Sequence, residues 1–399
     1  MNLKFRNCLC KKKIIYNSKN YISFKKLPMT EIFTNKFKKL KSFSLDQGVV
    51  FCKSCEHMRL TKFVDSKKIY NKNYLTSSSN SFSAKHANDE FYNFILKNLK
   101  QNKKYSKILE IGSNDLYLLK KFSKKAKNLI GIDPVIKRDK KLNNLKTYKD
   151  FFIKIDNNKI GLDIDSIICG HTLEHVENPE LFIKKTLSLS NNKTKIFFQF
   201  PSAESLINNC SFDQIHNQHL NYFSIKSFSK ILEKCGGRII DYDYNELHYG
   251  ALMVFFTIKS SKIKTKKIIK LKKKIINYNL VQSYQNFKVH LKTYKNLINQ
   301  YLSSNKKFYV IGAGLMLPII DYHLDGLIGK ADAILDDDPN KINKYFANIN
   351  TKIINLKNTD LRKSICLIAP VASAIITRKL ISVLEQKKAE IILTPTLTF

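Results

Sequence analysis

Short apolar runs alternate with amphipathic segments along most of this 399-residue chain. The middle part holds four such runs, each short enough for one strand: KILEI, NLIGID, IDSIIC and KIFFQFP. Strands that alternate with helices form βαβ units, which bury the apolar runs in a parallel sheet. The pattern therefore predicts an α/β domain over residues 85–258.

The alternation stops after this domain and restarts toward the C-terminus. A lysine-rich stretch with helical spacing of Ile and Leu predicts a connector over residues 259–305. Four further apolar runs follow it: KFYVIGAG, ADAILDDDP, SICLIAP and AEIILTP. They predict a second, Rossmann-like α/β domain over residues 306–399. Residues 1–80, which hold half of the cysteines, are predicted to form a separate small domain.

No stretch of the sequence predicts a membrane span. The first 17 residues, MNLKFRNCLCKKKIIYN, lack the apolar run of a signal peptide. The most apolar segment, residues 309–329, carries two aspartates and a histidine, so we interpret it as buried strand and helix. We therefore expect a cytoplasmic protein.

The chain is strongly basic, with 70 Lys and Arg against 32 Asp and Glu and a formal net charge of +38. Specific nucleic-acid binders concentrate such charge on one face or helix. Here the lysines are spread over every segment, and only residues 259–278 concentrate them. We attribute the charge to a bias toward A/T-rich codons, and nucleic acid is not the expected main partner.

The stretch LEIGSND is typical of a strand, a tight turn and the start of a helix. Gly112 lets the backbone approach a ligand closely, and Asn114 tolerates a left-handed conformation. Ser113, Asn114 and Asp115 suit a helix N-cap, which would leave free N–H groups facing a ligand. Asp133 ends the next predicted strand, where a carboxylate accepts from ribose hydroxyls. A nucleoside ligand fits, and the absence of a Walker lysine argues against a triphosphate.

Three stretches in order, EIGSND, GIDP and HTLEHVENP, resemble class I S-adenosylmethionine (SAM)-dependent methyltransferases. The resemblance implies that Glu110 contacts the methionine end of SAM and that Asp133 holds its ribose. Gly112, Ser113 and Asn114 would form the turn around the cofactor. The alternative is a Rossmann-like turn that binds another nucleotide.

Four N-terminal cysteines form two pairs, Cys8 with Cys10 and Cys52 with Cys55. Four thiolates suit a closed, tetrahedral structural zinc site. The first pair is separated by one residue instead of two, and His57 is an alternative ligand. Isolated free thiols are the other interpretation.

Together these parts resemble the sugar C-methyltransferase family. Its members combine an N-terminal zinc domain, a SAM-dependent methyltransferase domain and a C-terminal Rossmann-like domain. The resemblance implies methylation of a carbon next to the ketone of a nucleotide-linked 4-keto-6-deoxy sugar. Tyr74 loosely matches an aromatic residue near the substrate, and His175 matches a residue that faces the cofactor cleft.

The loop before LNYFS reads His216, Asn217, Gln218 and His219, where the family usually has Tyr-His-Glu-His. The resemblance implies that His219 is the base that removes the proton next to the ketone. His216 would act as a hydrogen-bond donor to the enolate oxygen, where a Tyr is usual. If the loop is helical, the two histidines face one pocket. A surface or capping role for both is the alternative.

VIGAG and LDDDP, with Gly312, Gly314 and Asp336, resemble a dinucleotide fingerprint, but Leu317 stands in place of its third glycine. We interpret this domain as a wall for the substrate nucleotide. Our leading hypothesis is a zinc-containing C-methyltransferase of a nucleotide-linked deoxyketosugar. The alternatives are a small-molecule O- or N-methyltransferase, an NAD-dependent oxidoreductase and a basic zinc protein that binds nucleic acid. The sequence does not determine the sugar or the oligomeric state.

Overall fold

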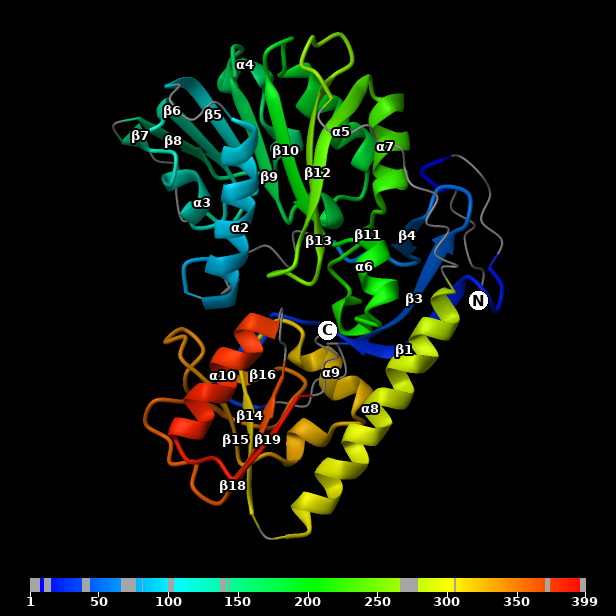
Figure 1. The fold of residues 1–399 in the computed structure, drawn as a ribbon, viewed down its shortest axis with the longest axis vertical. Helices are drawn as coiled ribbons and strands as arrows, with labels where there is room; N and C mark the ends of the chain where they lie inside the picture. Colours follow the sequence, from blue (N-terminus) through cyan, green and yellow to red (C-terminus); the bar gives the residue numbers. More distant parts are fainter. Residues whose placement is uncertain are drawn as a thin grey trace. The chain divides into compact units, whose positions relative to one another are not determined.

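The computed structural model describes residues 8–10, 16–37, 44–65, 77–80, 82–99, 104–136, 141–142, 144–265, 279–304, 306–369 and 374–394. The chain divides into two compact units, drawn as ribbons in Figure 1. Unit 1 comprises Met1–Asn20, Val50–Ser205 and His219–Tyr278, and unit 2 comprises Tyr21–Val49, Leu206–Gln218 and Asn279–Phe399. The division predicted from the sequence, into residues 1–80, 85–258, 259–305 and 306–399, stays a prediction.

Unit 1 is built on an eight-stranded sheet. In sheet order its strands are β12 (Gly237–Asn245), β13 (Ala251–Ile258), β10 (Lys195–Phe200), β9 (Ser166–Gly170), β5 (Tyr105–Ile111), β6 (Ala126–Ile132), β8 (Leu145–Tyr148) and β7 (Lys141–Leu142). Strands β10, β9, β5, β6 and β8 are parallel, whereas β13 pairs antiparallel with β10. The four strands predicted in the middle of the chain are confirmed as β5, β6, β9 and β10.

Helices cover both faces of this sheet. Successive strand residues point to opposite faces, so Ile108 packs in a cluster with Phe91 and Phe94 of α2 (Phe82–Asn98). Its neighbour Leu109 packs in the cluster that contains α5 (Pro179–Ser188) and α7 (Ile225–Lys234). Figure 1 shows α2 and the pair α5 and α7 on different sides of the strands. This three-layer arrangement confirms a mixed α/β fold with a Rossmann-like sheet.

Several short helices complete the element list between residues 82 and 330: α3 (Tyr117–Lys120), α4 (Asn157–Ile160), α6 (Ala203–Asn208), and the 3-10 helices η2 (Phe152–Lys154), η3 (Leu173–His175), η4 (Phe212–Gln214) and η5 (Leu327–Lys330).

The strand order reverses between β5 and β9. From β5 the chain continues outward through β6 to β8, and it then returns to β9 and β10 on the other side. In open parallel sheets, ligands bind beside the carboxyl ends of the strands at such a reversal. In unit 1 this point lies at the turns that follow Ile111 and Gly170.

A smaller antiparallel pair in unit 1 joins distant parts of the chain. β4 (His57–Leu60) pairs with β11 (Asn221–Tyr222), and the N–H of Leu60 donates to the carbonyl of Leu220 at 3.0 Å. β4 follows the turn that begins after Cys52, the last residue of β3 (Ser44–Cys52), and carries Cys55. The pairing therefore places the segment after His219 beside the cysteine-bearing part of the chain.

Unit 2 contains a five-stranded parallel sheet. In sheet order its strands are β17 (Ile353–Asn355), β15 (Ala333–Asp336), β14 (Lys307–Ile311), β18 (Ser364–Ile368) and β19 (Ile391–Leu393). The other elements of this unit are α8 (Leu280–Leu302), α9 (Leu317–His323), α10 (Ala374–Gln386), β1 (Tyr21–Pro28), β2 (Phe33–Thr34) and β16 (Tyr345–Phe346). β3 (Ser44–Cys52) runs from unit 2 into unit 1. The four C-terminal strands predicted from apolar runs are confirmed.

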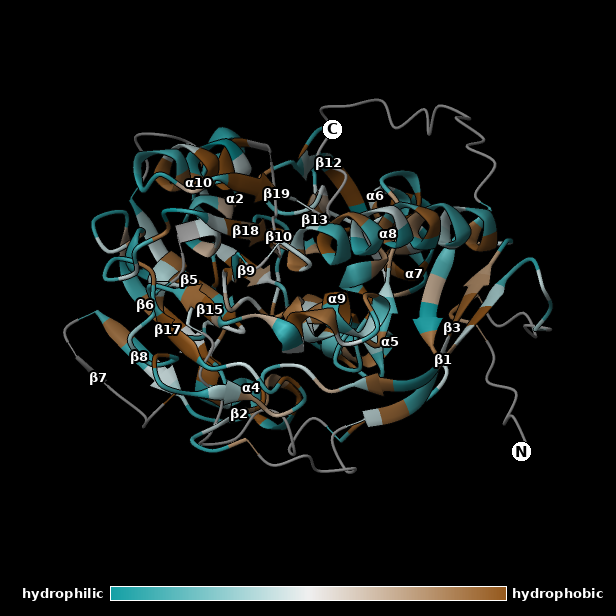
Figure 2. Ribbon diagram, turned by 90° about the horizontal axis from the view of Figure 1, so that it is seen from below, coloured by the Kyte–Doolittle hydropathy of each residue, from teal (hydrophilic) through white to brown (hydrophobic). Residues whose placement is uncertain are grey.

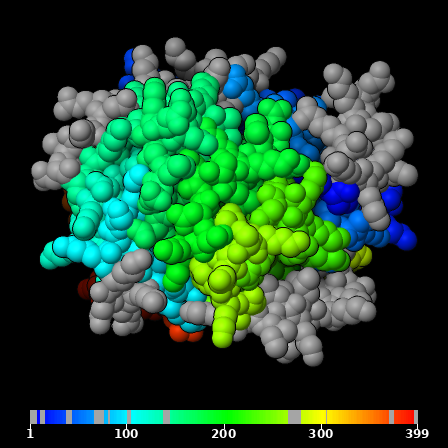
Figure 3. Space-filling model, turned by 90° about the horizontal axis from the view of Figure 1, so that it is seen from above, coloured from blue at the N-terminus to red at the C-terminus, as the bar shows by residue number. Residues whose placement is uncertain are grey.

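The hydropathy of these elements follows their burial. In Figure 2 strands β15 and β18 are largely hydrophobic, whereas α8 and α10 alternate between hydrophilic and hydrophobic positions. Figure 3 shows that residues coloured from cyan to yellow-green form most of the visible face of unit 1. Among the helices in the described part of the chain, none is both long and apolar enough to cross a membrane.

Candidate active site

The turn after β5 requires a glycine at its first position. Gly112 has a φ of 75°, and its N–H donates to the carbonyl of Ile132 at 2.8 Å. A β-carbon at this position would lie 1.9 Å from Oγ1 of Thr172, which follows β9. The turn after β5 is thus in contact with the segment after β9, at the reversal of the sheet.

Asn114 adopts the left-handed conformation that we predicted for it, with a φ of 44°. The predicted N-cap is wrong, because α3 is a single turn that begins after Leu116, whose φ is 69°. The prediction of free N–H groups is also wrong for two residues. The N–H of Ser113 donates to the carbonyl of Ile132, and the N–H of Asn114 donates to the carboxylate of Asp133. The turn folds back onto the end of β6, which takes up these donors.

Asp133 lies directly after β6 and is buried. Its Oδ2 accepts from the N–H of Asn114 and its Oδ1 accepts from the N–H of Val135, both at 2.9 Å. Burial raises the pKa of this carboxyl above its usual value. Each carboxylate oxygen has a second lone pair, so the group retains the capacity to accept from ribose hydroxyls.

Glu110 is a buried carboxyl on β5, and 4% of its surface is exposed. Burial, together with the nearby carboxylates of Asp133 and Asp115, raises its pKa well above the usual value. Among the residues that the structure describes, Oε2 of Glu110 has no hydrogen-bond partner. A buried carboxylate is stable only with a donor or a cation beside it. The amino group of SAM has the required charge, so Glu110 fits this cofactor.

The serine-rich stretch contacts the turn after β5. The hydroxyl of Ser77 donates to the carboxylate of Asp115, and the N–H of Ser79 donates to Oδ2 of Asp115 at 2.7 Å. Burial alone raises the pKa of Asp115, but these hydrogen bonds bring it below the usual value. Tyr74 lies outside the described residues.

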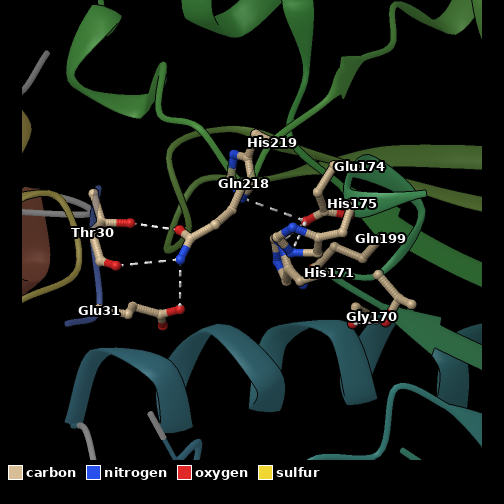
Figure 4. A network of polar contacts seen from close by, with 10 residues as sticks. Thr30, Glu31, Gly170, His171, Glu174, His175, Gln199, Gln218 and His219 are labelled. Atoms are coloured by element: carbon tan, nitrogen blue, oxygen red, sulfur yellow. Dashed lines mark hydrogen bonds and ion pairs between the residues drawn. The ribbon is translucent and has the colours of Figure 1, made fainter. Parts of the chain in front are cut away.

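Three histidines surround Glu174 in unit 1 (Figure 4). Its Oε1 lies 3.1 Å from Nδ1 of His171, 3.9 Å from Nε2 of His175 and 4.0 Å from Nε2 of His219. Glu174 is fully buried, which raises its pKa to about 7. The ring centres of His175 and His219 are 5.0 Å apart. The structure therefore brings the predicted residues His175 and His219 together around a carboxyl that we did not predict.

The loop that carries His216 and His219 is a turn at residues 217–218, so the prediction of a helical loop is wrong. His216 is buried in unit 2 and His219 belongs to unit 1. In unit 2 the amide of Gln218 accepts from the hydroxyl of Thr30 at 2.5 Å and donates to Oε2 of Glu31 at 3.2 Å. These contacts, rather than helical spacing, determine the conformation of the loop.

A family model described as a methyltransferase domain matches residues 83–241. Residues 83–241 are a SAM-dependent methyltransferase domain. The match covers β5, β6, β9 and β10, and it includes Glu110, Asp133 and His219. The functional class predicted from the sequence is confirmed for this part of the chain.

One curated relative of the methyltransferase domain is the C-methyltransferase NovU of Streptomyces niveus, which is 24% identical over 153 residues. The aligned region covers 37% of this chain and about a third (36%) of the length of that relative.

Among solved structures, the 1,6-didemethyltoxoflavin-N1-methyltransferase of Burkholderia thailandensis, with bound S-adenosylhomocysteine, is 9% identical. The aligned region covers 43% of this chain and 78% of the N1-methyltransferase chain, with a TM-score of 0.35. The N-methyltransferase NodS of Bradyrhizobium japonicum WM9, also with S-adenosyl-L-homocysteine, is 13% identical. The aligned region covers 45% of this chain and 88% of the NodS chain, with a TM-score of 0.35.

The four predicted zinc ligands converge in unit 1. The Sγ atoms of Cys8, Cys10, Cys52 and Cys55 all lie within 4.8 Å of one another. Sγ of Cys8 is 3.2 Å from that of Cys55, and Sγ of Cys10 is 3.8 Å from that of Cys52. Four thiols at these separations fit a tetrahedral zinc ion, for which metal–sulfur bonds are about 2.3 Å. His57 is not part of this group; it is buried beside Phe223.

The fingerprint in unit 2 is only partly formed. Gly312 has a φ of 95°, and the carboxylate of Asp336 accepts from the N–H groups of Ala313 and Asp338, at 2.6 and 2.8 Å. Nζ of Lys341 lies 3.9 Å from Oδ2 of Asp336. These partners resemble those of Asp133 in the methyltransferase domain. The interpretation of this domain as a wall for the substrate nucleotide stays a prediction, with NAD binding as the alternative.

Sequence reasoning missed Glu174, His171 and Gln199. Glu174 and His171 lie in the quoted stretch HTLEHVENP, next to the predicted His175. Gln199 is a single polar residue near the end of an apolar strand, and its Nε2 lies 2.8 Å from Nε2 of His171. A buried glutamine at the carboxyl end of a central strand was the signal that could have found it.

Proposed function

We propose that the protein is a SAM-dependent C-methyltransferase of a nucleotide-linked 4-keto-6-deoxy sugar. The observation that carries this proposal is the position of His219 beside the buried Glu174, after β9, in the same unit as the cofactor turn. Methylation of oxygen or nitrogen needs less of a base than methylation of a carbon, which must first lose a proton. A histidine next to a buried carboxylate provides such a base. The name of the NovU relative and the family resemblance support the choice of carbon and of sugar.

The proposed cofactor site consists of Glu110, Asp133 and the turn at Gly112, Ser113 and Asn114. Glu110 would face the amino group of SAM and Asp133 its ribose. SAM supplies an electrophilic methyl group on a sulfonium. His175, 3.9 Å from Glu174, would border the cofactor side of the cleft.

The proposed reaction begins when His219 removes the proton next to the ketone. The resulting enolate needs a hydrogen-bond donor at its oxygen, and Tyr74 is the residue proposed for this role. The donor role of His216, a buried residue of unit 2, stays a prediction. SAM, held by Glu110, Asp133 and the turn at Gly112, would supply the methyl group that the enolate carbon takes up. The zinc site of Cys8, Cys10, Cys52 and Cys55 is proposed to be structural, because four cysteine ligands leave no open position.

Methyl transfer tests this proposal. The purified chain is incubated with SAM and a panel of nucleotide-linked 4-keto-6-deoxy sugars, and the products are analysed by mass spectrometry and NMR. A new carbon–methyl bond next to the ketone supports the proposal. A methyl group on oxygen or nitrogen would favour the O- or N-methyltransferase, and hydride transfer with NAD would favour the oxidoreductase.

A further inference from the structure

The turn between β12 and β13 carries a histidine, His248, at the edge of the sheet where the parallel strands end. β13 runs antiparallel to β10, and Leu252 near the start of β13 pairs with Phe200, the last residue of β10. His248 therefore lies at the carboxyl edge of β10, which neighbours β9 and the His171 segment that follows β9. Open parallel sheets bind their ligands at this edge.

The buried side chain of Asn245 and its backbone fix this turn. Its Oδ1 accepts from the N–H of Leu247 at 3.1 Å. Its backbone carbonyl accepts from the N–H groups of His248 and Gly250, both at 3.0 Å. Tyr249 and Gly250 follow with φ values of 54° and 65°, in the left-handed region that a residue with a side chain rarely adopts. Strained backbone of this kind is typical of functional sites.

His171, which stacks on His248, already uses both nitrogens of its ring (Figure 4). Its Nδ1 lies 3.1 Å from Oε1 of Glu174, and its Nε2 lies 2.8 Å from Nε2 of Gln199. Nδ2 of Asn245 donates to Oε1 of Gln199 at 2.8 Å, which turns Nε2 of Gln199 toward His171. An amide nitrogen only donates, so His171 accepts at Nε2 and donates from Nδ1. The neutral ring of His171 therefore has no further hydrogen bond to offer to a substrate.

The ring of His248 has both capacities left. It stacks on the ring of His171 with centres 4.1 Å apart and planes at 27°. His248 is partly exposed, and within the described part of the chain no hydrogen bond reaches its ring. Loss of solvent around the ring, together with the neighbouring His171, lowers the pKa of His248 well below its usual value, so the ring is neutral at pH 7. A neutral imidazole offers one N–H donor and one acceptor.

The His171 segment connects His248 with both parts of the proposed active site. Thr172, the next residue, has its Oγ1 in the space that a β-carbon at the first position of the cofactor turn would need. In the other direction, Oε1 of Glu174 accepts from His171 and lies 4.0 Å from Nε2 of His219. His248 is thus one stacked ring away from the segment that contacts the cofactor turn and surrounds the proposed base.

We propose that His248 binds the substrate and donates a hydrogen bond to the oxygen of the reacting ketone. This inference rests on the proposed function. When His219 takes the proton, the electron pair of the broken carbon–hydrogen bond stays with the substrate, and negative charge develops on the ketone oxygen. A donor already in place stabilises this charge without rearrangement. His248 keeps its own proton, as a neutral imidazole does when it polarises a carbonyl group.

His248→Phe separates hydrogen bonding from packing, because phenylalanine keeps a ring against His171 but has no donor. Wild type and His248→Phe, both with S-adenosyl-L-homocysteine bound, are mixed in deuterated buffer with a nucleotide-linked 4-keto-6-deoxy sugar. NMR follows exchange of the proton next to the ketone. We expect exchange to slow about 10²–10³-fold, with unchanged affinity for S-adenosyl-L-homocysteine. His290→Phe, beside Tyr294 on α8 of unit 2, is the matched control and should exchange at the wild-type rate.

Nitrogen-15 NMR of the wild-type chain provides a second test if His248→Phe fails to fold. The full-length protein with labelled histidines and bound S-adenosyl-L-homocysteine is titrated with the 4-keto sugar nucleotide. We expect one protonated nitrogen in the ring of His248 at pH 7, and a shift of its resonance when the sugar nucleotide binds. The nucleoside diphosphate alone, which lacks the ketone, should leave this resonance in place.

His248→Gln should recover part of the exchange rate that His248→Phe loses, because the glutamine amide is again a donor. The proposal is overturned if His248 carries protons on both nitrogens at pH 7, or if its resonances do not respond to the sugar nucleotide. Exchange at the wild-type rate in His248→Phe also overturns it. So does a loss of affinity for S-adenosyl-L-homocysteine in His248→Phe, because His248 would then bind the cofactor.

These outcomes separate this proposal from the proposed function. Binding of the sugar at His248 is observed before any methyl transfer, whereas C-methylation is observed in the product. If His248 responds to the sugar but the methyl group appears on oxygen or nitrogen, the reaction assignment fails and the binding role of His248 stands. If carbon is methylated but His248 does not respond and its substitution does not slow exchange, only the role of His248 fails.

Discussion

Oγ1 of Thr172 occupies the space that a side chain on residue 112 would need. A β-carbon at Gly112 would lie 1.9 Å from this atom, and the φ of 75° is itself unfavourable for alanine. We expect Gly112→Ala to lower the free energy of unfolding by about 2–5 kcal/mol, from backbone strain and overpacking together. It should also weaken binding of S-adenosyl-L-homocysteine. Urea unfolding and calorimetry measure the two effects.

Gly236→Ala is the matched control for this prediction. Gly236 has a φ of 91° in the same unit, but a β-carbon there would meet no atom within 4 Å. Gly236→Ala should therefore lower the free energy of unfolding by only about 1–2 kcal/mol, from backbone strain, and leave ligand binding unchanged. Equal effects of the two substitutions would show that the contact with Thr172 does not matter.

Asp133→Asn tests the ribose contact with little damage to the turn. Asn keeps one oxygen that accepts from Asn114 or Val135, which Ala would not. Loss of the charge should weaken binding of S-adenosyl-L-homocysteine by about 1.5–3 kcal/mol, the value for hydrogen bonds to a charged group. Calorimetry on Asp133→Asn and on the half-buried control Asp150→Asn measures this. Unchanged affinity in Asp133→Asn would place the ribose elsewhere.

The sequence predicted those parts of the site that depend on neighbouring residues. The strands around Gly112 are short apolar runs, and the left-handed Asn114 follows from the residue type. The N-cap position falls on Leu116, while the carboxylate of Asp115 accepts from the N–H of Tyr117 and also from Ser77 and Ser79, 38 and 36 residues away. Such contacts form only in the folded chain and leave no local pattern.

The hydrogen-bonded chain that ends at Glu174 was unpredictable for the same reason. Asn245 and Gln199 are 46 residues apart, and Gln199 and His171 are 28 apart. They meet because β12, β10 and β9 share one sheet, whose order apolar runs do not specify. The convergence of Cys8 with Cys55, by contrast, was predicted from the residue type, since thiols in pairs are typical of zinc sites.

Zinc content tests the cysteine cluster. We expect one zinc per chain in protein purified without chelator, and Cys52→Ser should lose it together with much of its stability, because metal binding contributes folding free energy. Cys235→Ser, a cysteine outside the cluster, should keep both. Elemental analysis and thermal unfolding measure these outcomes. A fully folded, metal-free wild-type chain would contradict the zinc assignment.

The buried Glu174 should make stability depend on pH. Its pKa is about 7 in the folded chain against an ordinary 4.5, so the folded state binds more protons between these values. The contribution of Glu174 to the free energy of unfolding is therefore fully present below pH 4.5. It is lost as the pH rises through 7, which lowers the free energy of unfolding by about 1–3 kcal/mol. Relative to wild type, Glu174→Gln should gain stability between pH 5 and pH 8. Urea unfolding at the two pH values measures this difference, and an unchanged difference would contradict it.

Proton exchange tests the central claim most directly. Wild-type protein and His219→Ala, both with S-adenosyl-L-homocysteine bound, are mixed in deuterated buffer with a nucleotide-linked 4-keto-6-deoxy sugar that wild type methylates. Exchange of the proton next to the ketone is followed by NMR, and calorimetry checks that cofactor affinity is unchanged. We predict that His219→Ala slows exchange by a factor of about 10²–10⁴, the usual contribution of a general base. Exchange at the wild-type rate in His219→Ala would contradict the role of His219 as the base.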